Sequence, residues 1–250
     1  MQSVVVVVPC YNEADRLDLT AFRESIAREP QLTYLFVDDG STDRTTDMLT
    51  AFAAEHPDRI QLLRLESNSG KAEAVRRGIH YSADHSADLI GYWDADLATP
   101  LTAIPSFVNA FAEPAVTLIM GSRVQLLGRN VHRKAVRHYL GRVFATVVSR
   151  LLDLRVYDTQ CGAKMLRPTP QMRQVFARPF KLRWCFDVEL LARLLGLQAR
   201  GEFDVARQCL ELPLHTWRDV GGSKLGPRQF PHVLGELMQL RTIVADERRR

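Results

Sequence analysis

Short apolar segments rich in β-branched residues alternate with longer segments of helical period over the first 120 residues of the chain. This alternation predicts strands joined by helices, as in α/β proteins. The expected strands are residues 4–8, 33–37, 60–65, 88–93 and 115–120. Because these segments are apolar almost throughout, we expect a mostly parallel sheet with helices on both faces.

Polar clusters follow the first four expected strands. They are PCYNE at 9–13, DDGSTD at 38–43, NSGK at 68–71 and DAD at 94–96. Parallel sheets bind ligands beyond the carboxyl ends of their strands, so we expect the four clusters to converge on one site. Taken singly, most of them also fit ordinary turns, and Ser41 or Thr42 is a suitable N-cap for a helix over 42–56.

Asp94 and Asp96 are the cluster that ordinary turn chemistry explains least well. Side chains two residues apart in an extended segment share one face, so their negative charges lie close together. A hard divalent cation relieves that repulsion, and Mg²⁺ or Mn²⁺ is usually held by few carboxylates together with substrate phosphate oxygens. By itself, however, an aspartate pair at this spacing is a weak motif.

Other phosphate-binding and catalytic motifs do not fit. Gly70 and Lys71 lack the upstream glycine and the following hydroxyl of a P-loop, and GGSKL at 221–225 lacks the second glycine of a nucleophile elbow. DADLAT places its threonine one residue later than the DxDxT of aspartate-nucleophile phosphatases, and neither GxGxxG nor HExxH occurs. Nucleotide-dependent transfer through a bridging metal is the chemistry that remains.

Composition narrows the class of protein only a little. The 250 residues are 46% hydrophobic and 25% charged, as in a globular domain. The formal charge of +4 is too small to select an anionic partner, and we expect no nucleic acid to bind. Neither a CxxC pair nor a zinc-ligand pattern occurs, which fits a reducing cytosol; the cysteines are Cys10, Cys161, Cys185 and Cys209. We expect no signal peptide and no transmembrane helix.

The segment 132–154 has the apolar spacing of a helix, with apolar residues at positions 136, 140, 143, 144, 147, 148, 151 and 152. Its basic residues are Arg133, Lys134, Arg137, His138, Arg142 and Arg150, and no acidic residue precedes Asp153. Periodicity alone favours a core-facing helix with a solvated basic face, while binding of phosphate or an anionic surface is the alternative. A final amphipathic helix over 230–250 either packs on the domain or touches lipid.

Five motifs follow one another along the chain: VVVVVPCYNE, FVDDGSTDRT, NSGKAEAVRRGI, YWDADLATP and MGSR. Together they resemble glycosyltransferase family 2, whose nucleotide-sugar domain has the GT-A fold. YDTQCGAKMLR, RWCFDVELL and TWRDVGGSKL further resemble its dolichyl-phosphate glucosyltransferase branch and bacterial polyprenyl-phosphate relatives. The resemblance implies one domain, with a nucleotide-sugar half over 1–125 and an acceptor half with amphipathic helices over 126–250. Members of that branch commonly carry a membrane-spanning segment, which we do not find in this sequence.

The resemblance implies a set of donor-binding residues. The nucleoside pocket would be lined by Pro9, Tyr11, Asn12 and Glu13, with Asp39 accepting a hydrogen bond from a uracil base. Lys71 would flank the nucleotide, and Arg76 either does the same or is an exposed helix residue. Asp94, Ala95 and Asp96 would bind the sugar nucleotide, with Asp94 on the ribose or the metal and Asp96 on the Mg²⁺ or Mn²⁺ that bridges the diphosphate. Mannosyl relatives tend to have glutamine where this chain has Ala98, which favours glucose.

The resemblance also implies acceptor-binding residues. Arg123, Arg133 and Arg137 would meet donor or lipid phosphates, a task that suits bidentate, permanently charged guanidinium groups. Gln160, Trp217, Ser223 and Lys224 would lie on the acceptor side. Asp158 is the catalytic base offered in related enzymes, or else a loop residue in an Asx turn. A phosphate acceptor has a second pKa of about 6 and needs little help from a base. Asp187 reads as a helix N-cap, with Glu189 in the first turn.

The expected activity is inverting transfer of a hexose, glucose from UDP-glucose, to a polyprenyl or dolichyl phosphate. Transfer of mannose from a GDP-sugar, or another family 2 reaction on a sugar or protein acceptor, is the enzymatic alternative. A nucleotide-sugar-binding scaffold is the alternative without catalysis, although such a scaffold would not need the acceptor half. We expect the protein to be cytoplasmic and peripheral on the cytoplasmic face of a membrane.

Overall fold

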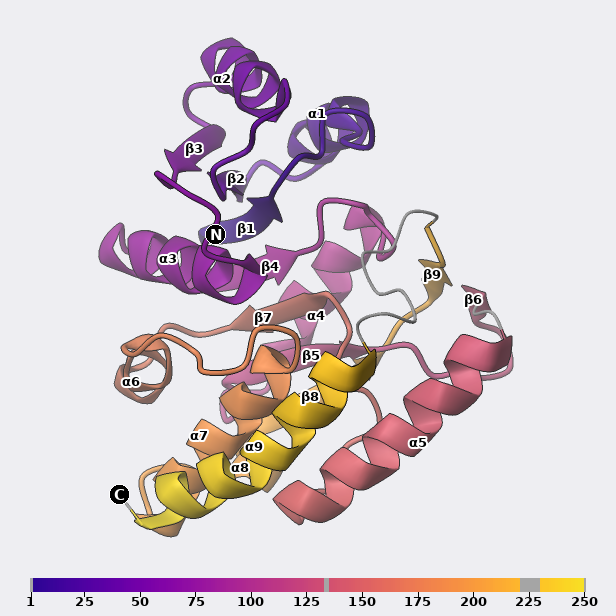
Figure 1. Ribbon diagram of the computed structural model, residues 1–250. Helices are drawn as coiled ribbons and strands as arrows, with labels where there is room; N and C mark the ends of the chain where they lie inside the picture. The colour runs from indigo at the N-terminus through magenta and orange to yellow at the C-terminus, as the bar shows by residue number, and fades with distance from the viewer. Residues whose placement is uncertain (1, 133–134, 221–229, 250) are drawn as a thin grey trace.

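The computed structural model describes residues 2–132, 135–220 and 230–249, except for the side chains of 135–138 and 230–234. Its centre is one seven-stranded sheet in the order β3-β2-β1-β4-β7-β5-β8, to which both halves of the chain contribute (Figure 1). The strands are β1 (Val4–Cys10), β2 (Leu32–Asp38), β3 (Ile60–Arg64), β4 (Leu89–Trp93), β5 (Leu118–Ser122), β7 (Ala163–Leu166) and β8 (Cys209–Pro213).

All five strands expected from the apolar pattern are present, with ends that differ by at most three residues. Strands β3, β2, β1 and β4 are mutually parallel, and β5 is parallel to β8. The sequence predicted neither β8 at the sheet edge nor β7, which runs antiparallel between β4 and β5. This strand is only four residues long and contains Lys164, so it lacks the long apolar run of its neighbours. The sheet is therefore mostly parallel, as expected.

Helices cover both faces of the sheet. On one face lie α1 (Leu19–Arg28), α2 (Thr45–Glu55) and α4 (Ile104–Ala110), the last preceded by the short η1 (Leu101–Ala103). On the other lie α3 (Lys71–Asp84), α5 (Ala135–Leu152), α6 (Pro170–Phe176), α7 (Phe186–Ala199) and α9 (Phe230–Arg249). The single turn α8 (Val205–Gln208) leads into β8. Two apolar cores result, one on each face of the sheet, and together they hold the strand ends in place.

A second, two-stranded parallel sheet lies beside the main one. It joins β6 (Asn130–His132) to β9 (Thr216–Arg218), and Val131 pairs with Trp217. Backbone N–H of Arg218 donates to the carbonyl of Ala98 at 3.0 Å, so this small sheet is attached to the loop that follows β4. The segment that brings Trp217 into the molecule thus lies against the DAD loop.

Two helix predictions need correction. Helix α2 begins at Thr45, and neither Ser41 nor Thr42 caps it, because its N-cap position is Arg44, which makes no side-chain cap bond. The predicted helix over 132–154 runs from Ala135 to Leu152, and His132 belongs to β6 instead. Within the described residues, no helix combines the length and the apolar character needed to cross a bilayer.

Candidate active site

The loops after β1 and β2 are bonded to each other at the carboxyl edge of the sheet. Asn12 adopts a positive φ of 52°, its side-chain oxygen accepts from the backbone N–H of Thr42 at 2.9 Å, and its own N–H donates to Ser41 Oγ at 3.0 Å. Backbone N–H of Glu13 donates to Thr45 Oγ1 at 2.8 Å. Ser41 and Thr42, which were expected to cap α2, therefore join the loop after β2 to the loop after β1.

Glu13 is buried, and its carboxylate forms a two-pronged pair with Arg16, with Nε–Oε2 and Nη2–Oε1 distances of 2.9 and 2.7 Å. Pro9 is half-buried and pairs with Val37 within the sheet, and Tyr11 is half-buried just beyond it. The first predicted cluster thus comes to the expected edge, with Asn12 and Glu13 shaping the loop from within.

Asp39 fastens the exit of β2 to the loop before α3. Its two carboxylate oxygens accept the backbone N–H groups of Ser69 and Gly70, each at 2.8 Å, and the side chain is buried. Burial raises the pKa of the Asp39 carboxyl above its ordinary value, although these two hydrogen bonds oppose the rise. Gly40, at φ 69°, lies against the backbone of Ser67, where a side chain would not fit. Three of the four clusters are thereby joined.

Asp94 joins the fourth cluster to the third. Its carboxylate lies 2.5 Å from Nζ of Lys71, the first residue of α3. Burial acts to lower the pKa of Lys71, but the charges of Asp94 and Asp187 together with the hydrogen bond to Asp94 outweigh it and raise that pKa above its ordinary value. Backbone N–H of Asp94 donates to the carbonyl of Gly162 at 2.9 Å, and a Cβ on Gly162 would overlap the Asp94 carboxylate. Gly162 is a site residue that the sequence did not single out.

Asp96 follows in the same loop, where its Oδ1 accepts the backbone N–H of Ala98 at 3.1 Å. Burial, and after it the charge of Asp94, raises the pKa of Asp96 above its ordinary value. Ala95 between them is buried. The described residues contain no cluster of three or more metal-ligating side chains. The two aspartates nevertheless fit Mg²⁺ or Mn²⁺, which commonly takes few protein carboxylates and completes its shell with phosphate oxygens and water.

Asp158, a few residues before Gly162 in the same loop, forms a two-point salt bridge with Arg123. Nε and Nη2 of Arg123 lie 2.6 and 2.7 Å from the two carboxylate oxygens, and its backbone N–H donates to Oδ2 at 3.0 Å. Glu211 of β8 accepts the backbone N–H groups of Tyr157 and Asp158, each at 2.7 Å. Although burial acts to lower it, the Asp158 carboxylate raises the pKa of Arg123 above its ordinary value. Asp158 is thus a salt-bridge partner that orients a cation.

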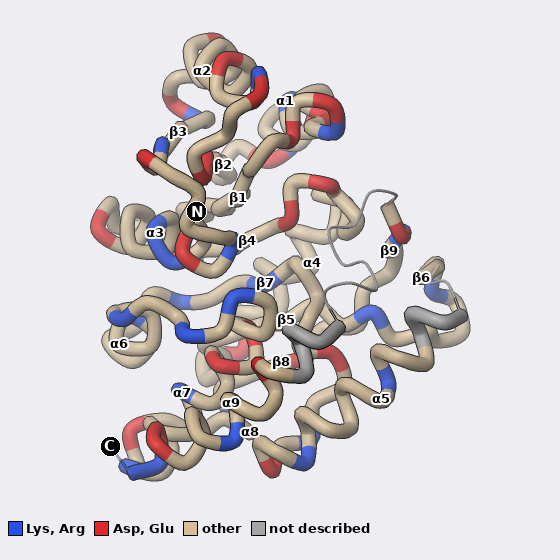
Figure 2. Tube along the Cα trace, viewed as in Figure 1, with Lys and Arg blue, Asp and Glu red and all other residues tan. Residues whose placement is uncertain are grey.

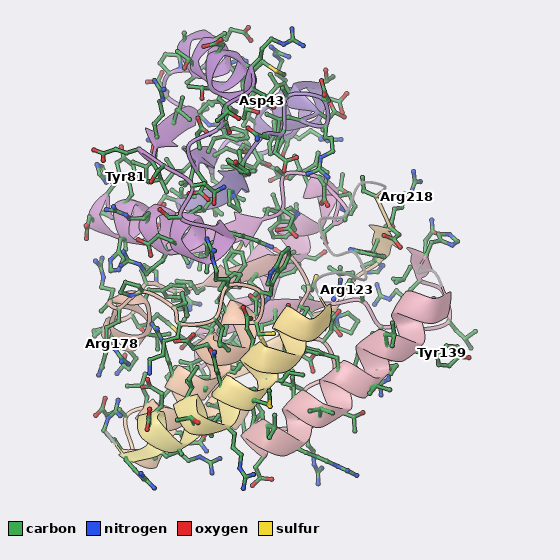
Figure 3. The ribbon with its side chains drawn as sticks, in the orientation of Figure 1. Asp43, Tyr81, Arg123, Tyr139, Arg178 and Arg218 are labelled. Carbon is green, nitrogen blue, oxygen red and sulfur yellow. The ribbon has the colours of Figure 1, made fainter. Side chains whose placement is uncertain are left out.

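Aromatic rings hold two arginines in this region. The guanidinium carbon of Arg123 lies 5.4 Å from the ring centroid of Trp217, and that of Arg142 lies 3.8 Å from the ring of Tyr157. Figure 3 labels Arg123 between the sheet and the upper end of α5. Nε2 of Gln160 is buried and has no hydrogen-bond partner among the described residues, which leaves a donor for a ligand. Arg142 and Tyr157 were not expected in the site.

A buried charge network lies beneath the loop that carries Asp158 and Gly162. Nζ of Lys164 is fully buried, donates to the carbonyls of Thr159 and Cys161 at 3.0 and 2.8 Å, and lies 2.8 Å from Asp187. The hydroxyl of Tyr92 also donates to Asp187. The predicted N-cap role of Asp187 is wrong, because Cys185 is the N-cap and Asp187 lies inside the first turn of α7. Glu189 lies in that first turn, as expected.

Residues 5–170 match the model of the family described as "Glycosyl transferase family 2". The chain belongs to this family. It is 31% identical over 241 residues to the dolichyl-phosphate beta-glucosyltransferase of Dictyostelium discoideum, covering 89% of this chain and 68% of that protein. It is 33% identical over 232 residues to the dolichyl-phosphate beta-glucosyltransferase ALG5C of Trichomonas vaginalis, covering 88% of this chain and 65% of that protein. This glycosyltransferase chain thus spans about two thirds of the length of these relatives.

Solved structures confirm the predicted GT-A type of fold for this family 2 chain. Glucosyl-3-phosphoglycerate synthase from Mycobacterium tuberculosis, in complex with Mn²⁺, UDP-glucose and phosphoglyceric acid, superimposes with a TM-score of 0.65. The two sequences are 17% identical, and the match covers 96% of this chain and 80% of that chain. At that identity the likeness concerns the fold.

Several predicted residues of the glycosyltransferase site are only partly described. Arg133, Ser223 and Lys224 lie outside the described residues, and Arg137 belongs to α5 but its side chain is not described. Arg76 pairs with Glu73 through its Nε and Nη2, each at 2.6 Å, and its Nη1 faces the carbonyl of Phe176. Its side chain is only 13% exposed, so Arg76 is a partly buried residue of α3 held by Glu73, and not the exposed helix residue of the alternative.

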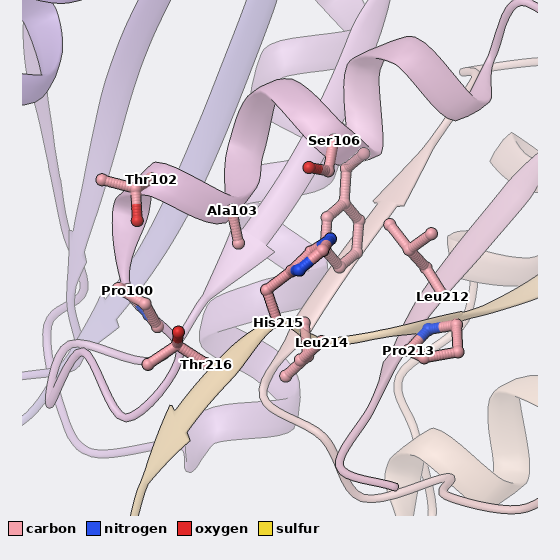
Figure 4. A pocket seen from close by; sticks show the side chains of 10 residues that line it. Pro100, Thr102, Ala103, Ser106, Leu212, Pro213, Leu214, His215 and Thr216 are labelled. Atoms are coloured by element: carbon pink, nitrogen blue, oxygen red, sulfur yellow. The ribbon is translucent and has the colours of Figure 1, made fainter. Parts of the chain in front are cut away.

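A small pocket of about 140 Å³ adjoins the loop after β4 in this family 2 fold (Figure 4). It lies between the η1–α4 segment and the chain that leads from β8 to β9, with Thr102, Ser106, His215 and Thr216 among its lining residues. None of the residues that line it is an arginine, a lysine or a carboxylate. The pocket therefore lacks the chemistry of a diphosphate site. The charged groups that such a site needs belong instead to Asp94, Asp96 and Arg123.

Proposed function

We propose that this family 2 chain transfers glucose from UDP-glucose to a dolichyl or polyprenyl phosphate. The observation that carries the proposal is the short loop 158–162, which contacts both the donor-side Asp94 and the acceptor-side Arg123. Gly162 supports Asp94 on the donor side, while Asp158 grips Arg123 on the other side. The names of the curated relatives, dolichyl-phosphate beta-glucosyltransferases, support the choice of glucose and of a lipid phosphate.

On the donor side, Asp96 would hold Mg²⁺ or Mn²⁺, with Asp94 beside it. When bound, the ion would neutralise the diphosphate and stabilise the leaving UDP. Burial, and after it the charge of Asp94, raises the pKa of Asp96, and a bound cation would offset both effects. Lys71 would add a second positive charge next to Asp94, and Asp39 would hold the loop before α3 in contact with the base. The complexes of the mycobacterial synthase with Mn²⁺ and UDP are in line with this assignment.

On the acceptor side, Arg123 would bind the lipid phosphate. A phosphate monoester with a second pKa of about 6 is already largely a dianion at neutral pH, so its oxygen needs no proton removed. Asp158, whose oxygens receive Arg123, would act by orienting that guanidinium. Two anions must approach each other, and fixed cations placed between them stabilise that encounter. Gln160, Trp217 and the predicted Arg133, Arg137, Ser223 and Lys224 would complete the acceptor side.

We further propose a single displacement with inversion. UDP-glucose is an α-glycoside, so one direct attack by the phosphate oxygen on C1 forms the new bond, releases UDP and leaves a β-linked product. The proposal places the chain at the cytoplasmic face of a membrane, where its acceptor would lie. The free cysteines Cys10, Cys161, Cys185 and Cys209 support a reducing compartment.

A donor and acceptor panel tests the proposal. The purified protein is incubated with radiolabelled UDP-glucose, UDP-galactose or GDP-mannose, each with a short polyprenyl phosphate or with 3-phosphoglycerate. We expect label in the organic phase with UDP-glucose and polyprenyl phosphate only. Label transferred from GDP-mannose would replace the donor assignment, and water-soluble product with 3-phosphoglycerate would replace the acceptor assignment. Nucleotide-sugar binding without any transfer would leave the scaffold alternative.

A further inference from the structure

Helix α5 has two apolar faces, and only one of them is buried. Phe144, Val148 and Leu152 lie against the core on the α7–α9 side of the sheet. Tyr139, Leu140, Val143 and Val147 are exposed, with exposed fractions of 71, 48, 63 and 40%. The periodicity of the sequence merged the two faces into one stripe. At 100° per residue, the exposed residues fall on a single sector next to the buried one.

Three more exposed apolar residues lie on segments that adjoin α5, namely the loop before β6 and helix α9. Leu126 and Leu127, in the loop that leads to β6 and α5, are 47 and 104% exposed. Met238 of α9, a helix in contact with α5, is 74% exposed. Figure 1 shows α5 along the outer edge of the molecule beside α9, and Figure 3 shows Tyr139 pointing away from the body. We call these seven residues the apolar rim; exposed apolar side chains gathered in this number usually mark an interaction site.

The charge along the segment that carries six of the seven rim residues is of one sign. Residues 123–152 contain six arginines, one lysine and no aspartate or glutamate. Figure 2 shows basic but no acidic residues along the described part of α5. Helices with a large apolar sector and basic flanks lie in the interface of anionic bilayers, with the apolar side chains below the headgroups.

We propose that the apolar rim inserts into the surface of an anionic lipid bilayer. The choice of a bilayer rests on the proposed function, since a polyprenyl phosphate must reach Arg123 from a membrane. Arg142 of α5 stacks on Tyr157, the neighbour of Asp158, so the rim continues into the acceptor side of the site. A second copy of the chain is a poor occupant, because a two-fold contact would bring this cationic surface against itself.

Two substitutions in the rim and one outside it test the proposal. Leu127→Asp and Val143→Asp place a charge where insertion is proposed, and Leu210→Asp places one on an exposed leucine of β8. Cys209 packs toward the α5–α7–α9 core, so Leu210 faces the opposite side of the sheet. Each protein is floated with phosphatidylcholine vesicles with or without phosphatidylglycerol, and circular dichroism verifies the fold.

We expect the unsubstituted protein and Leu210→Asp to bind the anionic vesicles alike, and each rim variant to bind about tenfold more weakly. High salt should weaken this binding without abolishing it, because the apolar part does not depend on charge. Absence of vesicle binding, or equal binding by all four proteins, would overturn the proposal. Sedimentation showing a dimer that Val143→Asp dissociates, with no vesicle binding, would overturn it in favour of self-association.

Activity separates this proposal from the function on which it rests. Val143→Asp should transfer glucose normally to a short polyprenyl phosphate dispersed in detergent, and poorly to the same acceptor embedded in vesicles. If the unsubstituted protein floats with vesicles but transfers to neither acceptor, the proposed function fails while the rim proposal stands. If it transfers to both acceptors equally well and does not float, the rim proposal alone fails.

Discussion

Arg123 and Asp158 are joined side to side, with Nε and Nη2 of the arginine 2.6 and 2.7 Å from the two carboxylate oxygens. An aspartate held in this way is poorly placed to accept a proton from a substrate, and well placed to aim a guanidinium. The proposed reaction has the same requirement, since its nucleophile is already an anion. The pair therefore suggests that charge placement, more than proton transfer, carries this catalysis.

The first prediction compares the two members of that pair. Arg123→Ala should lower turnover about a hundredfold, as expected for the loss of a charge that stabilises the transition state. Asp158→Asn should lower it less, because Arg123 remains present although less firmly held. The acid limb of the pH–rate profile, which reflects ionisation of the acceptor phosphate at a pKa of about 6, should persist in Asp158→Asn. Steady-state kinetics with varied acceptor, repeated over a range of pH, measures both turnover and the acid limb. If Asp158→Asn loses turnover and the acid limb together, Asp158 acts as a catalytic base.

The second prediction concerns Gly162. Gly162→Ala places a methyl group on the Asp94 carboxylate, so Asp94 must move away from its position beside Lys71. We expect UDP to bind at least about tenfold more weakly by calorimetry with Mg²⁺ present, a loss of about 1.4 kcal/mol. Gly235→Ala is the matched control, because it lies in α9 with open space around it and should bind UDP normally. Unchanged UDP binding in Gly162→Ala would show that Asp94 does not contribute to the donor site.

The third prediction uses the pKa of Asp96. Burial and the charge of Asp94 raise that pKa, so the ionised carboxylate is unfavourable in the folded protein, which gains stability as the pH falls through the raised value. In chelator at neutral pH, Asp96→Asn should therefore raise the Tm. Mg²⁺ with UDP should then raise the Tm of the unsubstituted protein by mass action, and hardly that of the variant.

Differential scanning fluorimetry measures these shifts in Tm. Asp58→Asn, at an exposed aspartate in the turn before β3, is the control and should behave as the unsubstituted protein. If UDP binds equally well in excess chelator and Asp96→Asn still responds to Mg²⁺, the metal assignment is wrong.

The fourth prediction concerns the buried ion pair of Lys164 and Asp187. Removal of one partner of a buried pair leaves an uncompensated charge and typically costs about 3–5 kcal/mol of unfolding free energy. Lys164→Met should show a loss of this size in urea denaturation, and Lys164→Met with Asp187→Asn should lose less than the sum of the two single changes. Lys181→Met, at an exposed lysine 3.9 Å from Asp246, should be nearly neutral.

The same variants separate a structural role from a positioning role. Lys164 donates to the carbonyls of Thr159 and Cys161, which the double variant does not restore. We therefore expect the double variant to recover stability but to keep a lowered kcat, with its KM for UDP-glucose less affected. Full recovery of both stability and kcat would limit this network to a structural role.

The sequence predicted those parts of the fold that depend on local pattern. Five apolar runs became strands, and the polar clusters behind four of them meet at one edge, because parallel strands joined by helices leave no other arrangement. Strand β7 escaped prediction because Lys164 interrupts its apolar pattern, and the buried carboxylate of Asp187 that neutralises it comes from a distant helix. No local pattern carries that information.

The sequence also could not predict which side chains contact one another or which face of a helix is buried. Asn12 and Asp39 fit a nucleotide pocket by resemblance, but their contacts with Thr42, Ser69 and Gly70 depend on how two loops meet in space. Likewise, the spacing in α5 could not reveal that Val143 is exposed and Val148 buried, because both positions belong to one wide apolar sector.

The most direct test of the central claim is the anomeric configuration of the product. The protein is incubated with UDP-glucose, Mg²⁺ and a short polyprenyl phosphate, the lipid is extracted, and proton NMR records the coupling of the anomeric proton to H2 and to phosphorus. We predict a glucosyl phospholipid with the large H1–H2 coupling of a β-glucoside and with coupling to phosphorus. An α-linked product, glucose on an acceptor other than the phosphate, or no glucosyl lipid at all would contradict the account.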